Sequence, residues 1–458
     1  MIRGAKDYKE TGVGWLKRIP KDWDIISSKR LFSERKERAR PDDKQMTASQ
    51  KYGVIYQDEF MRLENQKVVQ VIIGSDILKH VEPYDFVISM RSFQGGLEYS
   101  RDRGCISSAY VMLIPSADIV PEYFRYLFKS SAYIQALQAT SNLVRDGQAM
   151  RYGNFAQVPL PVVPKGEQRE IADFLDRETS RIDQLVDKKE QLVKLLDQKK
   201  GVEIIRKCAG IPSTTPSVPD KKVIQELVHS VGLPKEWKLG KFHNVFTVRK
   251  NNKNTGMIED NLLSLSYGNI VRKDMSSNEG LIPESYETYQ IVYPGDIVLR
   301  LTDLQNDKRS IRQGLVKEKG IVTSAYDAVY VGREHDPVFW AYTLLSLDLA
   351  KYYYSLGGGV RQSVKFRDIP NMLVKFPNLE EQKKISASIA ENVKKIDDVV
   401  AKTKTSINSL HQFRSSLITE AVTGQLDIHA WAKRGAGDRR LDKIEEEMEQ
   451  KKGKKASA

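Results

Sequence analysis

Two long stretches of the chain carry apolar residues at the spacing of an α-helix with one narrow apolar side. In the first, residues 166–208, successive apolar positions lie three, four or seven residues apart, and charged residues fill most other positions. Neither Gly nor Pro interrupts residues 167–200. This pattern predicts a long helix with a coiled-coil stripe of Ile171, Leu175, Ile182, Leu185, Leu192 and Leu196.

The second stretch, residues 379–424, has the same character. Gly424 is a plausible end for this helix, because glycine readily adopts the left-handed conformation found after a helix C-terminus. The predicted stripe consists of Ile385, Ile389, Ile396, Val399, Leu410, Phe413 and Leu417.

Helices of this length need a partner. About 40 residues at 1.5 Å per residue give about 60 Å, which is too long for one small domain to cover. We expect the two stripes to pack on each other. If the two halves of the chain are related by an internal two-fold axis, the helices lie antiparallel with globular domains at opposite ends. The alternative is that each helix packs only on its own globular domain.

Short β-type runs and short aromatic helices precede each long helix. Each series closes on a strand bounded by proline, which predicts a mixed α/β domain in front of each helix. The β-type runs include residues 67–73, 85–90, 108–114 and 296–301, the aromatic helices lie near 122–139 and 337–354, and the closing strands are 158–164 and 372–377.

The chain contains an internal repeat. "IPKDWDI" at Ile19–Ile25 recurs as "LPKEWKL", "EQREI" at Glu167–Ile171 recurs as "EQKKI", and "RIDQLV" at Arg181–Val186 recurs as "KIDDVV". Each second copy lies 214 residues after the first, as Trp23 and Trp237 show.

Looser matches lie between these anchors in the same order. Their offset drifts by two or three residues, as expected when loops differ in length on a common scaffold. They pair residues 83–88 with 294–299, 104–113 with 320–330, and 147–152 with 361–366. Six ordered matches at nearly one offset indicate a duplicated unit of about 210 residues, which is a domain duplication and not a solenoid.

The predicted fold is therefore α+β, with two pseudo-symmetric mixed α/β domains joined by two long antiparallel coiled-coil helices. The predicted division is 1–165 for the first domain, 166–208 for the first helix, 209–222 for a Pro/Ser/Thr-rich linker, 223–378 for the second domain, 379–424 for the second helix, and 425–458 for a charged tail.

The charge balance favours a polyanionic partner. Of 458 residues, 73 are Lys or Arg and 60 are Asp or Glu, a formal net charge of +13. Nucleic acid is the commonest partner for such a surplus. The alternative is a protein that is merely basic.

Motifs for catalysis and metal binding are missing. The chain has no phosphate-binding glycine loop, no H-E-x-x-H pair, no G-x-S-x-G elbow and no base-holding Asn- or Asp-Pro-Pro-aromatic tetrad. Its two cysteines lie far apart without a histidine cluster, so we expect no metal site. "PDDK" at Pro41–Lys44 faintly resembles part of a nuclease motif, but without a partner E-x-K we interpret it as a polar turn.

Nothing in the sequence indicates export or membrane insertion. The first ten residues are polar and charged, and no apolar run approaches the roughly 18 residues of a membrane span. We expect a soluble, cytoplasmic protein.

Together the motifs resemble a known family. An E-Q-x-x-I start, a following Ile-Asp pair and a long helix behind a variable domain, each present twice, are similar to type I restriction-modification specificity subunits. The resemblance covers about residues 15–424.

This resemblance implies a non-catalytic DNA-reading subunit with two target recognition domains, each reading one half of a bipartite site in double-stranded DNA. The helices would fix the gap between half-sites and dock two modification (methyltransferase) subunits. Those subunits use S-adenosylmethionine to methylate adenine, and two restriction subunits use ATP and magnesium for translocation and cleavage. No cofactor would bind this chain itself.

Base-reading residues cannot be placed by motif matching, so we select polar and basic residues beside the repeated anchors, because Arg and Gln can bond base edges. In the first domain they are Arg91, Ser92, Gln94, Arg101, Arg103, Arg145, Gln148 and Arg151. In the second domain they are Arg300, Asp303, Gln305, Arg309, Arg312, Arg361, Gln362 and Lys365.

Two other functions remain open from the sequence. One is the specificity subunit of a type IIB-like restriction enzyme, which shares this architecture but pairs with a fused nuclease–methylase. The other is a non-enzymatic coiled-coil scaffold whose basic charge serves solubility.

Overall fold

The computed structural model describes residues 8–67, 77–88, 96–140, 150–211, 234–274, 285–302, 311–355, 364–366, 369 and 372–433. The chain forms two compact units. Unit 1 comprises residues 1–189 and 405–458, and unit 2 comprises residues 190–404. The predicted linker and charged tail lie largely outside the described residues.

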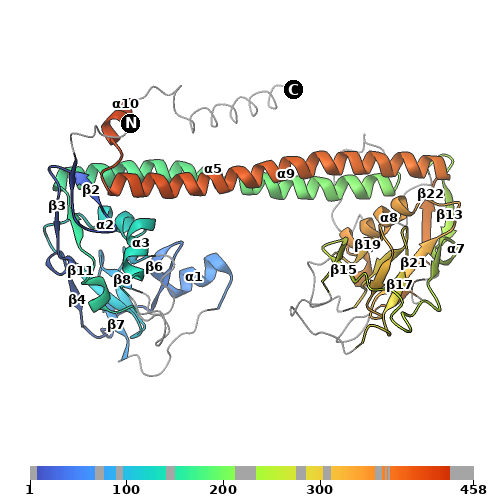
Figure 1. Cartoon of the computed structure of the whole chain (residues 1–458), viewed down its shortest axis with the longest axis horizontal. Coiled ribbons are helices and arrows are strands. Elements are labelled where there is room, and N and C mark those ends of the chain that lie inside the picture. Colours follow the sequence, from blue (N-terminus) through green and yellow to red (C-terminus); the bar gives the residue numbers. More distant parts are fainter. Residues whose placement is uncertain are drawn as a thin grey trace. The chain divides into compact units, whose positions relative to one another are not determined.

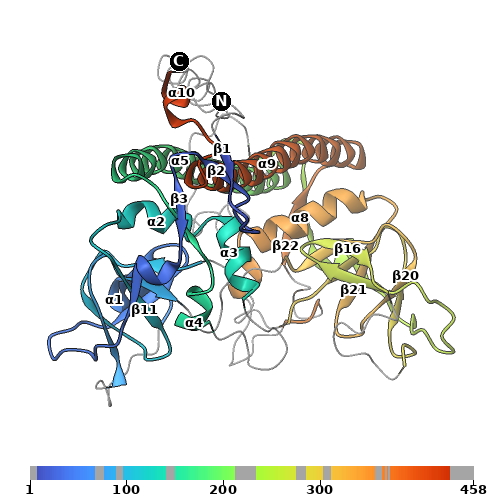
Figure 2. The same ribbon diagram turned by 60° about the vertical axis from the view of Figure 1, so that its left-hand side comes forward.

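Two long helices dominate the structure. They are α5 (Lys165–Cys208) and α9 (Leu379–Val422), which confirms both predicted helices. Each helix contributes to both units, and in each unit the two lie side by side (Figures 1 and 2). None of the described helices is both long and apolar enough to span a membrane.

The helices pack antiparallel. In unit 2, Lys200 Nζ donates to Asp397 Oδ1 at 2.7 Å, and Lys207 Nζ donates to Ser388 Oγ at 2.6 Å, so numbers rise on α5 as they fall on α9. In unit 1, Arg414 Nε donates to Asp183 Oδ1 at 2.9 Å. Asp183 and Asp397 are the aspartates of the repeated Ile-Asp motif, so this motif ties each helix to the other.

The predicted apolar stripe is correct at the ends of the helices and wrong near their middle. Ile171, Leu175, Ile182, Leu185, Ile389, Leu410 and Leu417 are buried, and Leu196, Ile385, Ile396 and Phe413 are half-buried. Leu192 is 41 % exposed and Val399 is 45 % exposed, whereas the neighbouring Val400 is buried. In this region the buried side of α9 therefore passes through Val400, one position after the predicted residue.

Unit 1 is built on a four-stranded antiparallel sheet in the order β4-β11-β8-β9. Its strands are β4 (Phe32–Arg35), β8 (Phe86–Ile88), β9 (Glu98–Tyr99) and β11 (Val111–Pro115). The core beside this sheet is aromatic: the Phe32 ring contacts the rings of Phe86, Phe124, Phe128 and Phe155.

Smaller elements complete unit 1. Its other strands pair two by two. They are β1 (Tyr8–Glu10), β2 (Arg18–Pro20), β3 (Asp24–Ile26), β5 (Met46–Ser49), β6 (Gly53–Tyr56), β7 (Lys79–Val81), β10 (Gly104–Ile106) and β12 (Leu160–Val162), and its short helices are η2 (Ser28–Arg30), α1 (Gln57–Glu64), α2 (Pro121–Leu127), α3 (Ser131–Gln138), α4 (Tyr152–Phe155) and α10 (Ile428–Lys433).

Unit 2 has a six-stranded sheet in the order β14-β21-β18-β19-β16-β15. Helix α8 (Pro337–Leu349) lies between this sheet and the helix pair (Figures 1 and 2). The strands of unit 2 are β13 (Lys238–Lys241), β14 (Phe246–Val248), β15 (Leu263–Ser266), β16 (Asn269–Arg272), β17 (Gln290–Val292), β18 (Ile297–Leu299), β19 (Gln313–Leu315), β20 (Gly320–Val322), β21 (Asp327–Val331) and β22 (Leu373–Phe376), and its short helices are α7 (Phe242–Val245) and η4 (Tyr352–Ser355).

The repeated E-Q motif has the same structural task in both units. In unit 1, the Gln168 side chain accepts from the Val120 N–H and donates to the Val163 carbonyl, both at 2.7 Å. In unit 2, Gln382 accepts from the Asp336 N–H and donates to the Pro377 carbonyl, both at 2.9 Å. Each buried glutamine thus joins the start of a long helix to a short helix and to the strand before it.

The repeated Pro-x-x-Trp motif receives the end of a long helix. Gly424, at a φ of +71°, packs against Pro20 and Trp23 in unit 1, where an added Cβ would come within 2.6 Å of the proline ring. Gly210, at a φ of +65°, packs against Pro234 and Trp237 with the same spacing of 2.6 Å. Both positions therefore require glycine, for conformation and for space.

Candidate nucleic-acid interface

Most residues selected as base readers cannot be placed. Those outside the described residues are Arg91, Ser92, Gln94, Arg145, Gln148, Asp303, Gln305, Arg309, Arg361 and Gln362. Those that the structure places are Arg101, Arg103, Arg151, Arg300, Arg312 and Lys365.

Arg101 and Arg103 lie in the loop between β9 and β10 of unit 1. Arg101 is exposed and lines a groove of about 750 Å³ that also reaches the helix pair within this unit. The groove carries basic and acidic side chains together, such as Arg125 and Asp176. Arg103 is exposed but held by carboxylates, with Nη2 2.7 Å from Asp42 Oδ2 and Nε 3.2 Å from Asp43 Oδ1.

Three further candidates lie at loop edges. Arg151 is exposed immediately before α4. Arg300 follows β18, and its N–H donates to the Arg312 carbonyl at 2.7 Å. Lys365 is half-buried, with Nζ 3.5 Å from the Ala325 carbonyl oxygen. These positions stay predictions.

The prediction for Arg312 is wrong for this conformation. Its side chain is 0 % exposed, its Nη1 donates to the Thr302 carbonyl at 2.8 Å, and its backbone N–H donates to Asp348 Oδ2 at 2.7 Å. A fully buried guanidinium is out of reach of a DNA groove. Arg312 instead supports the chain beside β19 and α8.

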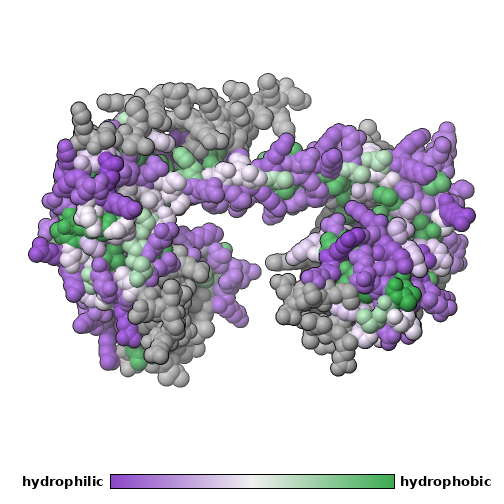
Figure 3. Space-filling view, viewed as in Figure 1, coloured by the Kyte–Doolittle hydropathy of each residue, from purple (hydrophilic) through white to green (hydrophobic). Residues whose placement is uncertain are grey.

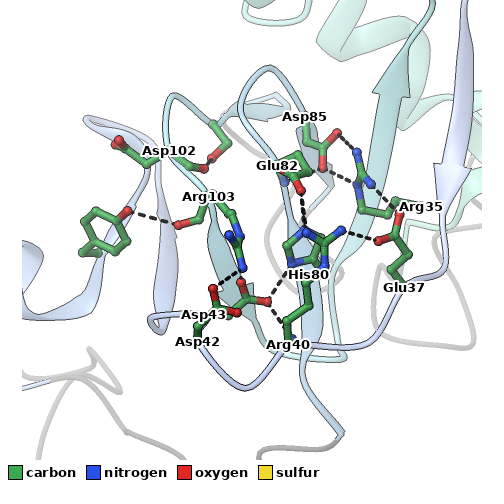
Figure 4. Close-up of polar contacts among 12 residues, drawn as sticks. Arg35, Glu37, Arg40, Asp42, Asp43, His80, Glu82, Asp85, Asp102 and Arg103 are labelled. Carbon is green, nitrogen blue, oxygen red and sulfur yellow. Dashed lines mark hydrogen bonds and ion pairs between the residues drawn. The ribbon is translucent and has the colours of Figure 1, made fainter.

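A buried histidine network organises one end of unit 1 (Figure 4). His80, on β7, is fully buried; its Nδ1 lies 2.6 Å from Asp43 Oδ2 and its Nε2 lies 2.7 Å from Glu82 Oε1. The hydrogen bond with His80 lowers the pKa of the Glu82 carboxyl. β7 lies at the end of unit 1 away from α5 (Figure 1).

Three arginines surround His80 and its carboxylates. Arg40 Nη1 donates to Glu82 at 3.1 Å and Nη2 donates to Glu37 at 3.0 Å. Arg35 bonds Glu37 at 2.6 Å, and Arg103 completes the network through Asp43. Charges of both signs are therefore held in fixed positions around the loop of residues 40–44.

One ion pair next to this network is common to both units. Arg35 holds the buried Asp85 with two hydrogen bonds of 2.6 and 3.0 Å. Arg249 holds Asp296 in the same way, at 2.9 and 2.7 Å. The hydrogen bonds with Asp296 raise the pKa of Arg249, so this guanidinium stays protonated. Since both units contain it, we assign the pair to the scaffold.

Pro41–Lys44 contributes to a turn, as interpreted from the sequence. The Asp43 N–H donates to the Arg40 carbonyl at 3.1 Å, and the Arg40 N–H donates to Asp43 Oδ2 at 2.7 Å. Within the described ranges, no group of three or more His, Cys, Asp or Glu side chains could hold a metal ion.

The sequence reasoning missed Asp42, Asp43 and His80 as neighbours of Arg103. Asp42 and Asp43 lie about 60 positions from Arg103 along the chain, and His80 lies about 20 positions from it. The pairing of β7 with β10 brings His80 close to Arg103, and the bridge between Gln45 and Cys105 brings the two aspartates there. The available signal was the polar pair Asp42–Asp43 inside a stretch otherwise rich in Arg and Lys.

The sequence and the fold were compared with known protein families and solved structures. A family profile described as "Type I restriction modification DNA specificity domain" matches residues 20–195. This part of the chain is therefore similar to that family. The resemblance found in the motifs is thereby confirmed, and unit 2 repeats the anchors of the specificity domain through Gln382, Asp397 and Trp237.

Two solved structures have the same fold. A chain from work on complex assembly and conformational transition of the type I R-M system aligns with a TM-score of 0.65 at 12 % identity, over 89 % of this chain and 99 % of that chain. The HsdS subunit from Thermoanaerobacter tengcongensis aligns with a TM-score of 0.51 at 14 % identity, over 90 % and 100 %. The predicted α+β fold with two long helices is confirmed. No curated protein sequence matches the chain.

Proposed function

We propose that this chain is the sequence-specific DNA-binding subunit of a type I restriction-modification complex, in which each recognition domain reads one half of a bipartite site. The observation that carries the proposal is the specificity-domain match to residues 20–195, together with the repetition of its anchoring contacts in unit 2. The net charge of +13 adds the electrostatic attraction that phosphate requires.

The helix pair would set the unread spacer and dock the modification subunits. In unit 2 the helix pair exposes three apolar side chains that a docked partner protein would cover. They are Leu192, Leu195 (61 % exposed) and Val399. The visible surface along the helices is otherwise mostly hydrophilic (Figure 3).

Catalysis would belong to the partners. Two methyltransferase subunits would supply S-adenosylmethionine chemistry on adenine, and two restriction subunits would supply ATP- and magnesium-dependent translocation and cleavage. The family resemblance supports this division of labour, as does the solved type I R-M assembly in which a similar chain occurs.

Methylation sequencing tests the proposal directly. Genomic DNA from cells with the gene should carry methyladenine within one bipartite sequence, and deletion of this gene alone should remove it. The purified chain without partners should neither methylate nor cleave DNA. Methyl transfer by the isolated chain, or an unchanged methylation pattern after deletion, would contradict the proposal.

Binding measured against salt separates this function from a basic scaffold. A DNA-reading complex should lose affinity steeply as salt rises and should keep its preference for one sequence. Weak binding that is blind to sequence would favour the scaffold. A partner gene that encodes a fused nuclease–methylase would favour the type IIB-like assembly.

A further inference from the structure

We propose that Arg103 and Asp42 form a base-reading pair of the first recognition domain, directed to one G·C base pair, and that buried Asp43 and His80 position it. This inference rests on the proposed DNA-reading function and names residues of that same surface. It is carried by the geometry of the network in Figure 4.

The side chain of Arg103 is held in place by two carboxylates and still keeps N–H donors for a further partner. Its Nε and Nη2 each donate to a carboxylate, Asp43 and Asp42 respectively, while 40 % of the side chain stays exposed. A guanidinium has five N–H groups, so the end formed by its two Nη atoms keeps donors for another partner. Guanine offers O6 and N7 in the major groove, which match two such donors.

Asp42 supplies the complementary acceptor. Its side chain is 68 % exposed, and one oxygen receives the Arg103 hydrogen bond at 2.7 Å. This bond lowers the pKa of the Asp42 carboxyl, so the group stays an acceptor. Cytosine presents its N4 amino group beside guanine O6, and carboxylates accept from that amino group. A donor fork next to a carboxylate therefore fits both edges of one G·C pair.

Asp43 and His80 hold this pair in place. Both side chains are fully buried, and Asp43 uses Oδ1 for Arg103 and Oδ2 for His80. The backbone is fixed as well, because the Cys105 N–H donates to the Lys44 carbonyl at 2.9 Å. Gly104 makes this approach possible, since a Cβ there would lie 2.5 Å from the Lys44 carbonyl oxygen. Such support from buried groups is what precise readout requires.

Among the described residues, the buried part of the network occurs in the first domain only, whereas its exposed pair has a counterpart in unit 2, where Lys319 Nζ lies 2.9 Å from Glu259 Oε2. β17 and β20 of unit 2 pair as β7 and β10 do, but Ile291 faces Ile321 where unit 1 has His80 facing Cys105. The Arg–Asp scaffold pair, in contrast, occurs in both units. If the two domains read different sequences, the differences at this position are the ones expected to serve each half-site: an arginine fork with buried support in unit 1, and a lysine in unit 2.

The test uses the full chain assembled with its modification subunits and a double-stranded DNA library randomised in both half-sites. Arg103→Lys keeps the charge but loses the fork, and Asp42→Asn loses the carboxylate. Each should reduce discrimination at one and the same G·C position by about 5- to 150-fold, the range for a bidentate base contact. The other half-site should be read unchanged.

The positioning role has its own readout. Asp43→Asn and His80→Gln should each reduce discrimination at the same base-pair position. Neither should add to the effect of Arg103→Lys in a double variant, because all three residues act through one contact. A general loss of structure would instead weaken both half-sites and lower the thermal midpoint. If the buried variants fail to fold, Arg103→Lys and Asp42→Asn still decide the matter, since both side chains are exposed.

Arg62→Ala is the matched control, because this α1 arginine has 76 % of its side chain exposed and belongs to the same unit. It should leave every base preference intact. If Arg103→Lys keeps full discrimination in a complex whose wild type reads a bipartite site, the inference is overturned and the proposed function stands. If the wild type shows no sequence preference, the proposed function itself fails.

Discussion

At the scale of single residues, the two buried glutamines show how a repeated motif acts. Gln168 and Gln382 are each about 1 % exposed, and each satisfies one backbone N–H and one carbonyl that would otherwise be buried without a partner. A glutamic acid in their place could not donate when ionised. The E-Q motif is therefore a structural requirement of the helix start. Because it is repeated in both units, we assign it to the scaffold and not to the reading of DNA bases.

Replacing one of these glutamines should destabilise its unit. Gln168→Ala removes two hydrogen bonds and leaves the Val120 N–H and Val163 carbonyl unsatisfied, which should cost about 2–5 kcal/mol in the free energy of unfolding. Urea denaturation measures the loss. Gln184→Ala on the same helix is the control, since Gln184 is exposed, and it should change stability by less than about 0.5 kcal/mol. Equal effects from both variants would contradict the assignment.

At the scale of elements, the ends of the long helices depend on glycine. Gly424→Ala should destabilise unit 1 by more than about 1 kcal/mol, because its φ is positive and the new methyl group would collide with Pro20. Gly153→Ala is the control: its Cβ would meet nothing within 4 Å. Thermal unfolding of both variants tests the prediction, and a neutral Gly424→Ala would show that the helix end shifts freely.

The start of α9 should be sensitive to acid. Burial lowers the pKa of His335, only partly offset by Glu334, and Gln382 Nε2 lies 3.4 Å from His335 Nδ1. A pKa lowered on folding gives stability that is present above the ordinary value of about 6.5 and is lost as pH falls below it. Unit 2 should therefore unfold at lower urea concentration at pH 5.5 than at pH 7.5.

His335→Phe isolates this contribution. Phenylalanine keeps the edge-on ring contacts with Trp340 and Phe376 but does not titrate. The difference in urea midpoint between the two pH values should become smaller in this variant. An unchanged difference would mean that other groups cause the acid sensitivity.

The elements also show what the sequence could predict. Both long helices were predictable within two residues of their ends, because a stripe over 44 residues leaves little ambiguity. The aromatic helix expected over residues 122–139 is instead two helices, since Ser130 caps a new helix by accepting from the Tyr133 N–H. The network of Asp43, His80 and Arg103 was not predictable, because only the pairing of β7 with β10 and the bridge between Gln45 and Cys105 bring these residues together.

At the scale of the whole molecule, the duplication makes each unit depend on distant segments. The core of unit 1 includes Leu410, Leu417 and Val422 from α9, and the Tyr123 hydroxyl donates to the Val422 carbonyl at 2.6 Å. Unit 1 is thus completed only by the C-terminal half of α9. A chain truncated after residue 404 should leave unit 1 without this part of its core, and limited proteolysis should then cleave within residues 8–165 far faster than in the full chain.

The helix pair offers the last prediction, which rests on its proposed role as spacer. Asp183–Arg414 fixes the register in unit 1 and Lys200–Asp397 fixes it in unit 2. An extra heptad must therefore enter both helices, between residues 183 and 200 of α5 and between 397 and 414 of α9, so that each ion pair survives. Seven residues also keep the stripes on their original sides.

Such an insertion lengthens the pair by about 10 Å, which corresponds to about three base pairs of duplex. The complex should then methylate a site whose half-sites are unchanged and whose spacer is longer by about three base pairs. Inserting the heptad into α5 alone is the control, because it breaks one of the two registers and should abolish specific methylation. A changed half-site sequence in the double insertion, or an unchanged spacer, would show that the helices do not set the distance between the reading domains.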